Sequence, residues 1–136
     1  MAQIEVESKL ESLDTLNDFV HSVIRNSPCT EQQRIQIDLV LEELFVNIVN
    51  YAYPESIGKV QVECKLSEDL NQAIITFKDR GIEFNPLARK EIEIHERFER
   101  RPVGGLGIYL AKKYTDSIEY ERAEDCNVLT IMKNLG

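Results

Sequence analysis

Residues 42–54, EELFVNIVNYAYP, place polar side chains on a part of a helix where the hydrophobic pattern does not require them. They form the second half of a helix predicted over 31–52, which begins after a capping-box pattern at Thr30 and Gln33 and ends before a proline. Glu43, Asn47 and Asn50 are spaced i, i+4 and i+7, so they form one line along that helix. A carboxylate and two amides framed by aliphatic residues are costly to bury unless hydrogen bonds or a ligand satisfy them.

Two interpretations of this polar line remain open from the residues alone. It is either a hydrogen-bonded network or solvated groove, or part of a catalytic site. In a catalytic site, Glu43 in a partly apolar cleft would have a raised pKa and act as a general base. Asn47, one turn further on, would offer its amide oxygen to Mg²⁺, a cation that is often held by few protein oxygens together with phosphate oxygens and water.

The rest of the chain predicts an α+β fold built around this helix. Hydrophobic periodicity predicts a block of helices on one side of a mostly antiparallel sheet. We expect a two-layer sandwich, in which a mixed, mostly antiparallel sheet of about five strands is covered on one face by about three helices. Outside 31–52, the expected strands are 3–8, 59–66, 72–78, 117–122 and 127–133, and the expected helices are about 12–25 and about 105–115.

Composition limits the class of protein. The chain has 136 residues, which fits one domain, and its net charge of −8 argues against nucleic acid as the main partner. No apolar run approaches the roughly 20 residues that a membrane span needs, and the first residues lack the pattern of a signal peptide. Three cysteines without CxxC spacing are typical of reduced thiols. We therefore expect a cytoplasmic protein that binds no membrane.

A glycine-rich stretch, RPVGGLGIYLAKKY at 101–114, precedes the last predicted helix. It is not a Walker loop, because no Lys-Ser or Lys-Thr follows the glycines, and it departs from the dinucleotide fingerprint at Leu110. Glycines at a helix start let the backbone approach an anion, and the helix presents free N–H groups to it. From these residues alone the stretch is either a hinge or a phosphate-binding loop.

EELFVNIVNYAYP, DRGIEFNP at 79–86 and RPVGGLGIYLAKKYTDSIEY at 101–120 occur in this order along the chain. With these motifs the chain resembles the small serine/threonine kinases that act as anti-sigma factors, the RsbW and SpoIIAB type, in the GHKL superfamily. The resemblance implies the Bergerat ATP-binding fold, a single domain over 1–136 with residues 87–103 as an ATP lid, and a homodimer.

The resemblance also implies roles for residues in the first two motifs. Glu43 matches the acid that activates the attacking hydroxyl or water, and Asn47 matches the asparagine that ligates Mg²⁺. Asp79 matches the aspartate that accepts a hydrogen bond from the adenine amino group. Gly81 matches the glycine that lets the base approach the backbone.

Further roles are implied around the phosphates and the adenine. The glycine loop that would hold phosphates through backbone N–H groups consists of Gly104, Gly105, Leu106 and Gly107. Thr130 matches a threonine near the adenine. Arg101 lies where a lid cation could reach the γ-phosphate, although a solvated charge pair with Arg100 is an equal interpretation.

Three positions depart from the pattern of the family that the chain resembles. Asn50 stands where relatives often carry a lysine or arginine that could help with phosphates, and Tyr51 replaces a common histidine. The glycine often found ahead of the threonine is absent, and Asp125-Cys126-Asn127 occupies that turn. These departures bear on the strength of ATP binding and leave the expected base and metal ligand in place.

The expected function is a Mg- and ATP-dependent serine/threonine kinase. By resemblance, its substrate is a STAS-domain antagonist protein, and it also sequesters a sigma factor or another regulator. The alternative is a nucleotide-binding module that binds a partner without phosphorylating it. The ATPase half of a histidine kinase and a gyrase-like ATPase are disfavoured, because the chain contains no second helical or transducer domain.

Overall fold

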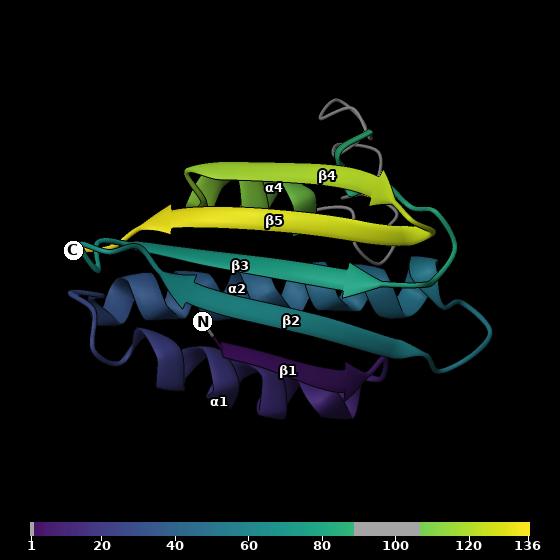
Figure 1. Cartoon of the computed structure of the whole chain (residues 1–136), viewed down its shortest axis with the longest axis horizontal. Helices are drawn as coiled ribbons and strands as arrows, with labels where there is room; N and C mark the ends of the chain where they lie inside the picture. The colour runs from purple at the N-terminus through teal and green to yellow at the C-terminus, as the bar shows by residue number, and fades with distance from the viewer. Residues whose placement is uncertain (1, 89–106) are drawn as a thin grey trace, which may run out of the picture.

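The computed structural model describes residues 2–88 and 107–136, and its core is one five-stranded sheet (Figure 1). The strand order is β1-β2-β3-β5-β4, and all four pairings are antiparallel. The α+β sandwich predicted from the sequence is confirmed, with antiparallel pairing throughout the described sheet. The strands are β1 (Ala2–Glu7), β2 (Lys59–Leu66), β3 (Gln72–Asp79), β4 (Ser117–Ala123) and β5 (Cys126–Asn134).

The helices of the described chain lie together on one face of this sheet (Figure 1). Helix α2 crosses behind the middle strands, with α1 beside it and α4 packed against its other side. They are α1 (Leu13–Ile24), α2 (Glu31–Asn47) and α4 (Gly107–Tyr114), together with the short 3₁₀ turns η1 (Leu10–Ser12) and η3 (Pro86–Ala88).

The helix predicted over 31–52 changes its winding at its C-terminal end. It is α-helical up to Asn47, and Ile48–Ala52 forms a π-helical turn, η2. Within that turn the Tyr53 amide donates to the Ile48 carbonyl oxygen, five residues back, at 3.2 Å. Because the π turn inserts extra backbone into the helix, Asn50 does not continue the line of Glu43 and Asn47 with the spacing that a regular α-helix would give.

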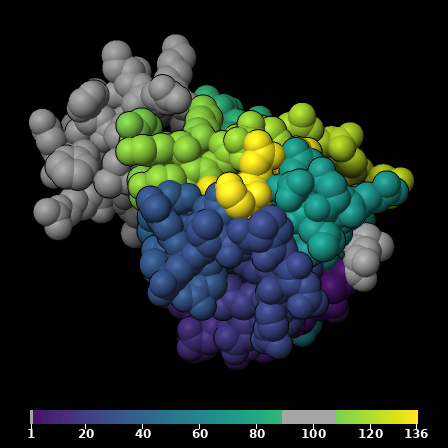
Figure 2. Space-filling view, turned by 90° about the vertical axis from the view of Figure 1, so that its left-hand side faces the viewer, coloured from purple at the N-terminus to yellow at the C-terminus, as the bar shows by residue number. Residues whose placement is uncertain are grey.

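The start of α2 is fixed both locally and by the C-terminus. Thr30 and Gln33 form the predicted capping box, with both hydrogen bonds at 3.1 Å. The Gln33 side-chain oxygen also accepts a hydrogen bond from the Gly136 amide at 2.9 Å. Figure 2 shows this end of the molecule, where the last residues lie between the start of α2, α4 and the turn that joins β2 to β3.

The core lies between the sheet and the helices. Alternate strand residues point toward the helices, as in Val60, Val62 and Phe77, which are at most 1% exposed. The other sheet face carries the intervening residues, which are half-buried or exposed except for the buried Cys126. The last residue of β3, Asp79, is two residues beyond Phe77, so it also points to the helix-facing side of the sheet. It lies at the end of the sheet where the π turn lies, since the Ile82 amide donates to the Ala52 carbonyl. Within the described part of the chain, no helix is both long and apolar enough to span a bilayer.

Candidate functional site

The last residue of β3, Asp79, is a buried carboxylate at the helix-facing side of the sheet. Its side chain is only 4% exposed. Its Oδ1 accepts two hydrogen bonds at 2.9 Å, one from the Gly81 amide and one from the Asn127 side chain. Burial raises the pKa of Asp79, and these hydrogen bonds and the nearby charge of Arg122 oppose that shift. Asp79 is thus a buried carboxylate that is stabilised by hydrogen-bond donors.

Asn127 is the polar centre around this carboxylate. Its side-chain nitrogen donates to Asp79 and to the Ile82 carbonyl, both at 2.9 Å. Its side-chain oxygen accepts the Tyr120 hydroxyl at 2.6 Å and the Phe84 amide at 3.1 Å. The amide is 5% exposed, and each of its two polar atoms has two partners. Asn127 therefore fixes both the carboxylate and the loop that follows β3.

Asn47 faces the same region from α2. It is 3% exposed, and its side-chain oxygen is buried without a hydrogen-bond partner in the described structure. Leaving a buried amide oxygen without a partner costs about 1–3 kcal/mol of stability. A ligand that interacts with the Asn47 oxygen would remove this cost. A hard cation such as Mg²⁺ prefers this type of oxygen. In the described residues no group of three or more acidic, histidine or cysteine side chains could hold a metal alone.

Glu43 lies one helical turn before Asn47 on α2. It is half-buried, and burial raises the pKa of its carboxyl group, with the neighbouring charge of Glu42 as a smaller cause. A carboxyl group with a raised pKa is a better proton acceptor when it is ionised. The raised pKa of Glu43 is thus the property that the sequence predicts for a general base at this position.

Asp79, Asn47 and Asn127 converge on one narrow cavity. Its volume is about 20 Å³, which is room for about one water molecule. Its remaining walls are apolar and come from α2, η2, β3, β4, β5 and the loop after β3. They are Leu44, Ile48, Ala52, Phe77, Phe84, Pro86, Tyr120 and Leu129. The cavity is therefore an apolar slot with a few convergent polar groups, the lining that small-molecule sites usually have, but its volume is far below the roughly 300–1,000 Å³ of such sites.

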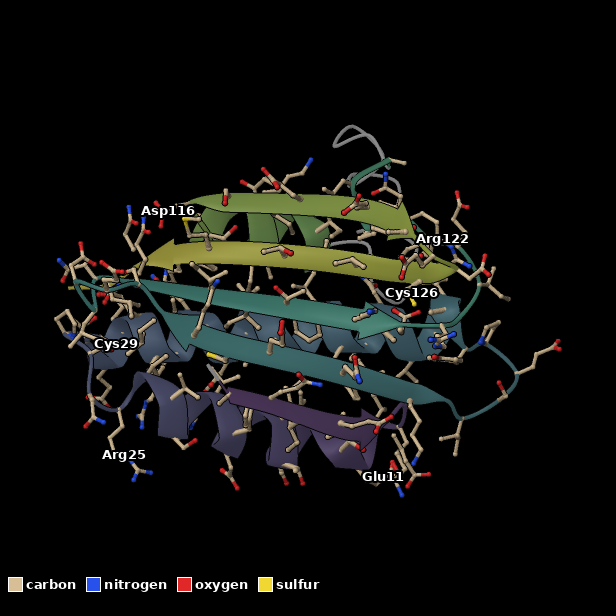
Figure 3. The ribbon with its side chains drawn as sticks, in the orientation of Figure 1. Glu11, Arg25, Cys29, Asp116, Arg122 and Cys126 are labelled. Carbon is tan, nitrogen blue, oxygen red and sulfur yellow. The ribbon has the colours of Figure 1, made fainter. Side chains whose placement is uncertain are left out.

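The loop after β3 is held against the end of the long helix. The Ile82 amide donates to the Ala52 carbonyl at 2.8 Å, and the Phe84 ring stacks on Tyr51 with centroids 4.8 Å apart. The Arg122 guanidinium donates to the Gly81 carbonyl at 2.9 Å. Figure 3 labels Arg122 at the sheet end where this loop begins. Loop and helix end thus form one packed unit around the cavity.

Gly81 has a steric role in this unit. A Cβ atom there would clash with the Ala52 carbonyl, which is backbone and cannot move aside. We expect Gly81→Ala to lower the free energy of unfolding by about 1–3 kcal/mol, measured by urea denaturation. Ile82→Ala is the matched control, because Ile82 is 61% exposed in the same loop. Equal stability of Gly81→Ala and the wild type would contradict this packing.

The structure does not bring every predicted residue to the cavity. Thr130 lies on the opposite face of β5 from Asn127 and Leu129, because it is an odd number of residues from both. Its hydroxyl oxygen lies 3.4 Å from that of Thr76 on the open face of the sheet. Asn50 is half-buried in the π turn and does not line the cavity. Thr130 therefore does not line this cavity, whereas Asn127 does, and the place of Thr130 near the adenine stays a prediction.

The predicted phosphate loop falls mostly outside the described residues. This holds for Arg101, Gly104, Gly105 and Leu106, and for most of the predicted lid 87–103. Gly107 is the first residue of α4, which packs beside α2. The start of the predicted helix at about 105 is thus described only from Gly107 onward.

Sequence reasoning missed Asn127, although the signal was present. The turn Asp125-Cys126-Asn127 stood out because it lacked an expected glycine, and Asn127 is its only amide. The parity of β5 would have separated Asn127 from Thr130, since residues three apart on a strand point to opposite faces.

We expect Asn127→Ala to disrupt the site more than any change at Thr130. The variant leaves Asp79, Tyr120 and two backbone groups short of a hydrogen-bond partner, at about 1–3 kcal/mol for each group left unsatisfied. Thr130→Val, its control on the opposite face, should leave ligand affinity unchanged. Calorimetric titration with ATP and urea denaturation measure the two effects. A larger affinity loss in Thr130→Val than in Asn127→Ala would support the predicted contact of Thr130 with the adenine.

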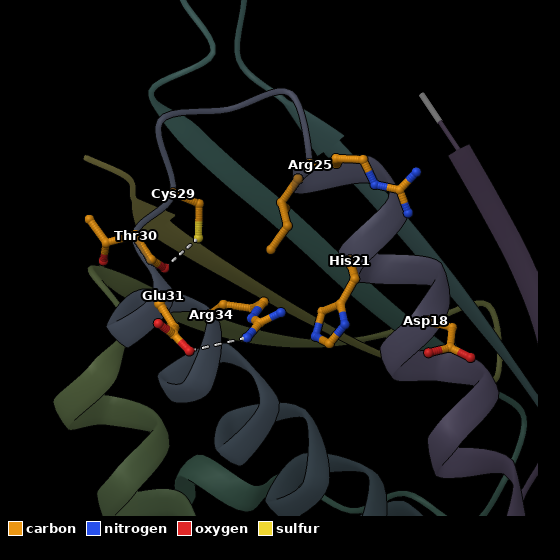
Figure 4. Close-up of a pocket in the computed structure, with 8 residues that line it drawn as sticks. Asp18, His21, Arg25, Cys29, Thr30, Glu31 and Arg34 are labelled. Carbon is orange, nitrogen blue, oxygen red and sulfur yellow. Dashed lines mark hydrogen bonds and ion pairs between the residues drawn. The ribbon is translucent and has the colours of Figure 1, made fainter.

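A second groove lies at the other end of the helical layer and shares no residue with this cavity (Figure 4). It has a volume of about 580 Å³ between the end of α1 and the start of α2. Its charges are mostly paired: Arg34 lies 3.8 Å from Glu31, and His21 lies 2.5 Å from Asp38, which is on α2. None of the predicted ATP-site residues lines it.

An antiparallel sheet covered on one face by helices, with a buried carboxylate and an amide from the long helix facing one slot, defines a class of ligand-binding α+β domain. The family model described as the histidine kinase-like ATPase domain matches residues 6–133, and the chain belongs to that family.

Named relatives give a narrower comparison. The chain is 31% identical over 93 residues to serine-protein kinase RsbW of Bacillus cereus and of Bacillus thuringiensis subsp. konkukian. It is 30% identical over 95 residues to the protein of the same name from Bacillus mycoides. In each case the match covers 67% of this chain and 58% of the relative. The chain therefore matches less than two thirds of the length of these relatives.

Proposed function

We propose that the protein is a Mg- and ATP-dependent serine/threonine kinase of the RsbW type. The observation that carries the proposal is the convergence of the buried Asp79 carboxylate and the unpartnered Asn47 amide oxygen on one apolar slot. The family match and the similarity to serine-protein kinases support the same activity.

Asp79 is the proposed adenine-binding residue. Its Oδ1 is occupied by Gly81 and Asn127, which hold the carboxylate in one orientation. A fixed carboxylate accepts hydrogen bonds and donates none when ionised, so it selects a base with an exocyclic amine. Adenine presents an amine at that position, whereas guanine presents an oxygen. The apolar walls of the slot suit the two faces of a purine ring. At about 20 Å³ the slot is too small to hold that ring, so adenine binding requires its walls to move apart.

Glu43 and Asn47 are the proposed catalytic pair on α2. Asn47 would hold Mg²⁺ through its side-chain oxygen, which fits a hard cation because it is buried and unpartnered. When bound, Mg²⁺ would neutralise charge on the phosphate oxygens. Glu43 would accept the proton of the substrate hydroxyl, and its half-buried position keeps the carboxylate away from full hydration.

The glycine stretch before α4 is the proposed phosphate loop. Gly104, Gly105, Leu106 and Gly107 keep the roles that resemblance gives them, with Arg101 and Asn50 assigned to the phosphate side. The packing of α4 beside α2 supports this assignment, because it places the start of α4 on the helix layer that carries Glu43 and Asn47. Residues 87–103 remain the proposed lid of a single domain over 1–136.

The proposed substrate is a STAS-domain antagonist protein, and the proposed second partner is a sigma factor or another regulator. A cytoplasmic homodimer completes the proposal. A non-catalytic module that binds ATP and a partner is the competing function. Glu43 favours the kinase, because binding alone does not require a half-buried carboxylate one turn from the metal ligand.

Incubation with Mg-ATP and a candidate STAS-domain protein tests the proposal. We expect one phosphorylated serine or threonine on that protein by mass spectrometry, together with calorimetric binding of ATP. ATP binding without phosphorylation of any candidate would favour the non-catalytic module. Failure to bind ATP would exclude both functions.

A further inference from the structure

The sheet carries a basic groove on the far side of β3 from the helix layer. Lys59, Lys78 and Arg80 line it, together with Glu5, Tyr53 and Cys126, and its volume is about 330 Å³. Lys59 begins β2, and Arg80 directly follows β3, so the groove lies at the end of the sheet where Figure 3 labels Cys126. We call it the basic groove.

The three cations come together through strand register. In the antiparallel pairing of β2 with β3, Gln61 is opposite Lys78 and Val60 is opposite Asp79. Continuing that register by one residue brings Lys59 and Arg80 level with each other. Side chains opposite or diagonal to each other on paired strands lie within reach of the same ligand. Three residues from two separate parts of the sequence thus form one positive patch.

The charges of the basic groove are not balanced internally. None of the three cations forms an ion pair within 4 Å in the described structure, and all three are exposed. Two acids lie at its β1 side: Glu5 lines the groove, and Glu7, which is opposite Lys59 in the strand register, lies 3.4 Å from Lys9. Asp79 also lines the groove, and its Oδ1 accepts hydrogen bonds from Gly81 and Asn127. Like charges on neighbouring strands repel each other. An anionic ligand would relieve this repulsion between the cations. The cluster stands out because the chain as a whole has a net charge of −8.

The backbone beneath the cations is held in place. The Tyr53 hydroxyl accepts a hydrogen bond from the Arg80 amide and donates one to the Lys59 carbonyl, both at 3.0 Å. One side chain therefore ties the strand ends that carry two of the three charges. The Arg80 N–H is used in this contact and is not available to a ligand. A compact phosphate site built from backbone N–H groups is thus disfavoured, and the groove offers separate side-chain cations.

We propose that the basic groove docks an acidic segment of a protein partner. Separate carboxylates of such a segment would each meet one of Lys59, Lys78 and Arg80, while Glu5 disfavours a ligand that is negative at the β1 side. The three cations come from the ends of two paired strands, so separate carboxylates along an extended chain can reach them. The groove lies on the sheet face opposite the slot lined by Asn47 and Asn127. The proposal does not depend on the proposed kinase activity, because binding is measured without nucleotide.

The test uses the full chain and a fluorescein-labelled hexaglutamate peptide, with fluorescence anisotropy at low ionic strength. We expect the triple variant K59Q/K78Q/R80Q to bind the peptide about tenfold or more weakly than the wild type, since each lost charge removes an electrostatic contact. Lys65→Gln is the matched control, because Lys65 is an exposed lysine on the same strand and the same sheet face but does not line the groove. Added salt should weaken wild-type binding.

Amide NMR spectra of the wild type with the same peptide give a second measurement that needs no variant. We expect the shifted signals to centre on residues 59–61 and 78–80. Absence of peptide binding, equal binding by the triple variant, or shifts centred elsewhere would overturn the proposal. If inorganic phosphate displaced the peptide at equal concentration, the groove would be a small-anion site and the peptide assignment would be wrong.

Discussion

Glu43→Gln is expected to lower the rate of phosphoryl transfer by about 10²–10⁴-fold, the usual contribution of a general base. The amide keeps the size of the side chain on α2 but cannot accept the proton of the attacking hydroxyl. Binding of Mg-ATP should change little, because Asp79 and Asn47 are untouched. The rate is measured as phosphate transferred to the partner protein, and affinity is measured by calorimetry.

Glu42→Gln is the matched control for this substitution. Glu42 is the preceding residue on α2 and is exposed, whereas Glu43 is half-buried. Burial raises the pKa of Glu43 above its ordinary value of 4.5. The wild-type rate should therefore rise with pH as Glu43 loses its proton through that raised pKa, and Glu43→Gln should lack this limb. A normal transfer rate in Glu43→Gln would remove the base assignment.

Asp79→Asn is expected to weaken ATP binding by about 10- to 100-fold, the effect of losing one hydrogen bond to a charged group. The amide can present a donor where the adenine amine also presents one. Discrimination between ATP and GTP should fall with it. Calorimetric titration with both nucleotides measures the change. Asp125→Asn is the control, since Asp125 is exposed in the turn before β5 and asparagine tolerates its positive φ of 63°.

The stability of Asp79→Asn separates a binding defect from a folding defect. Burial raises the folded-state pKa of Asp79 above 3.8, so its contribution to stability is fully present below that pH and is lost as the pH rises through the folded-state pKa. The neutral asparagine carries no such loss, so the variant should be at least as stable as the wild type in urea at neutral pH. Unchanged ATP affinity in a folded Asp79→Asn would place the adenine elsewhere.

Much of the fold could be predicted from local patterns. Alternating residues gave the five strands to within one residue at each end, and the capping pattern at Thr30 and Gln33 located the start of α2. The line of Glu43 and Asn47 was visible because a helix brings residues four apart onto one face. The π turn at Ile48–Ala52 was not predicted, because it depends on backbone hydrogen bonds that the side-chain pattern does not reveal.

The sequence by itself determined which elements form and which local faces are polar, since both depend on neighbours a few residues apart. Only the tertiary structure decided which residues of different strands meet. It placed Asn127 beside Asp79, turned Thr130 to the other face, and gathered Lys59, Lys78 and Arg80 around one groove. The physical reason is that strand register determines which residues of neighbouring strands come into contact. A shift of one residue moves a side chain to the opposite face of the sheet.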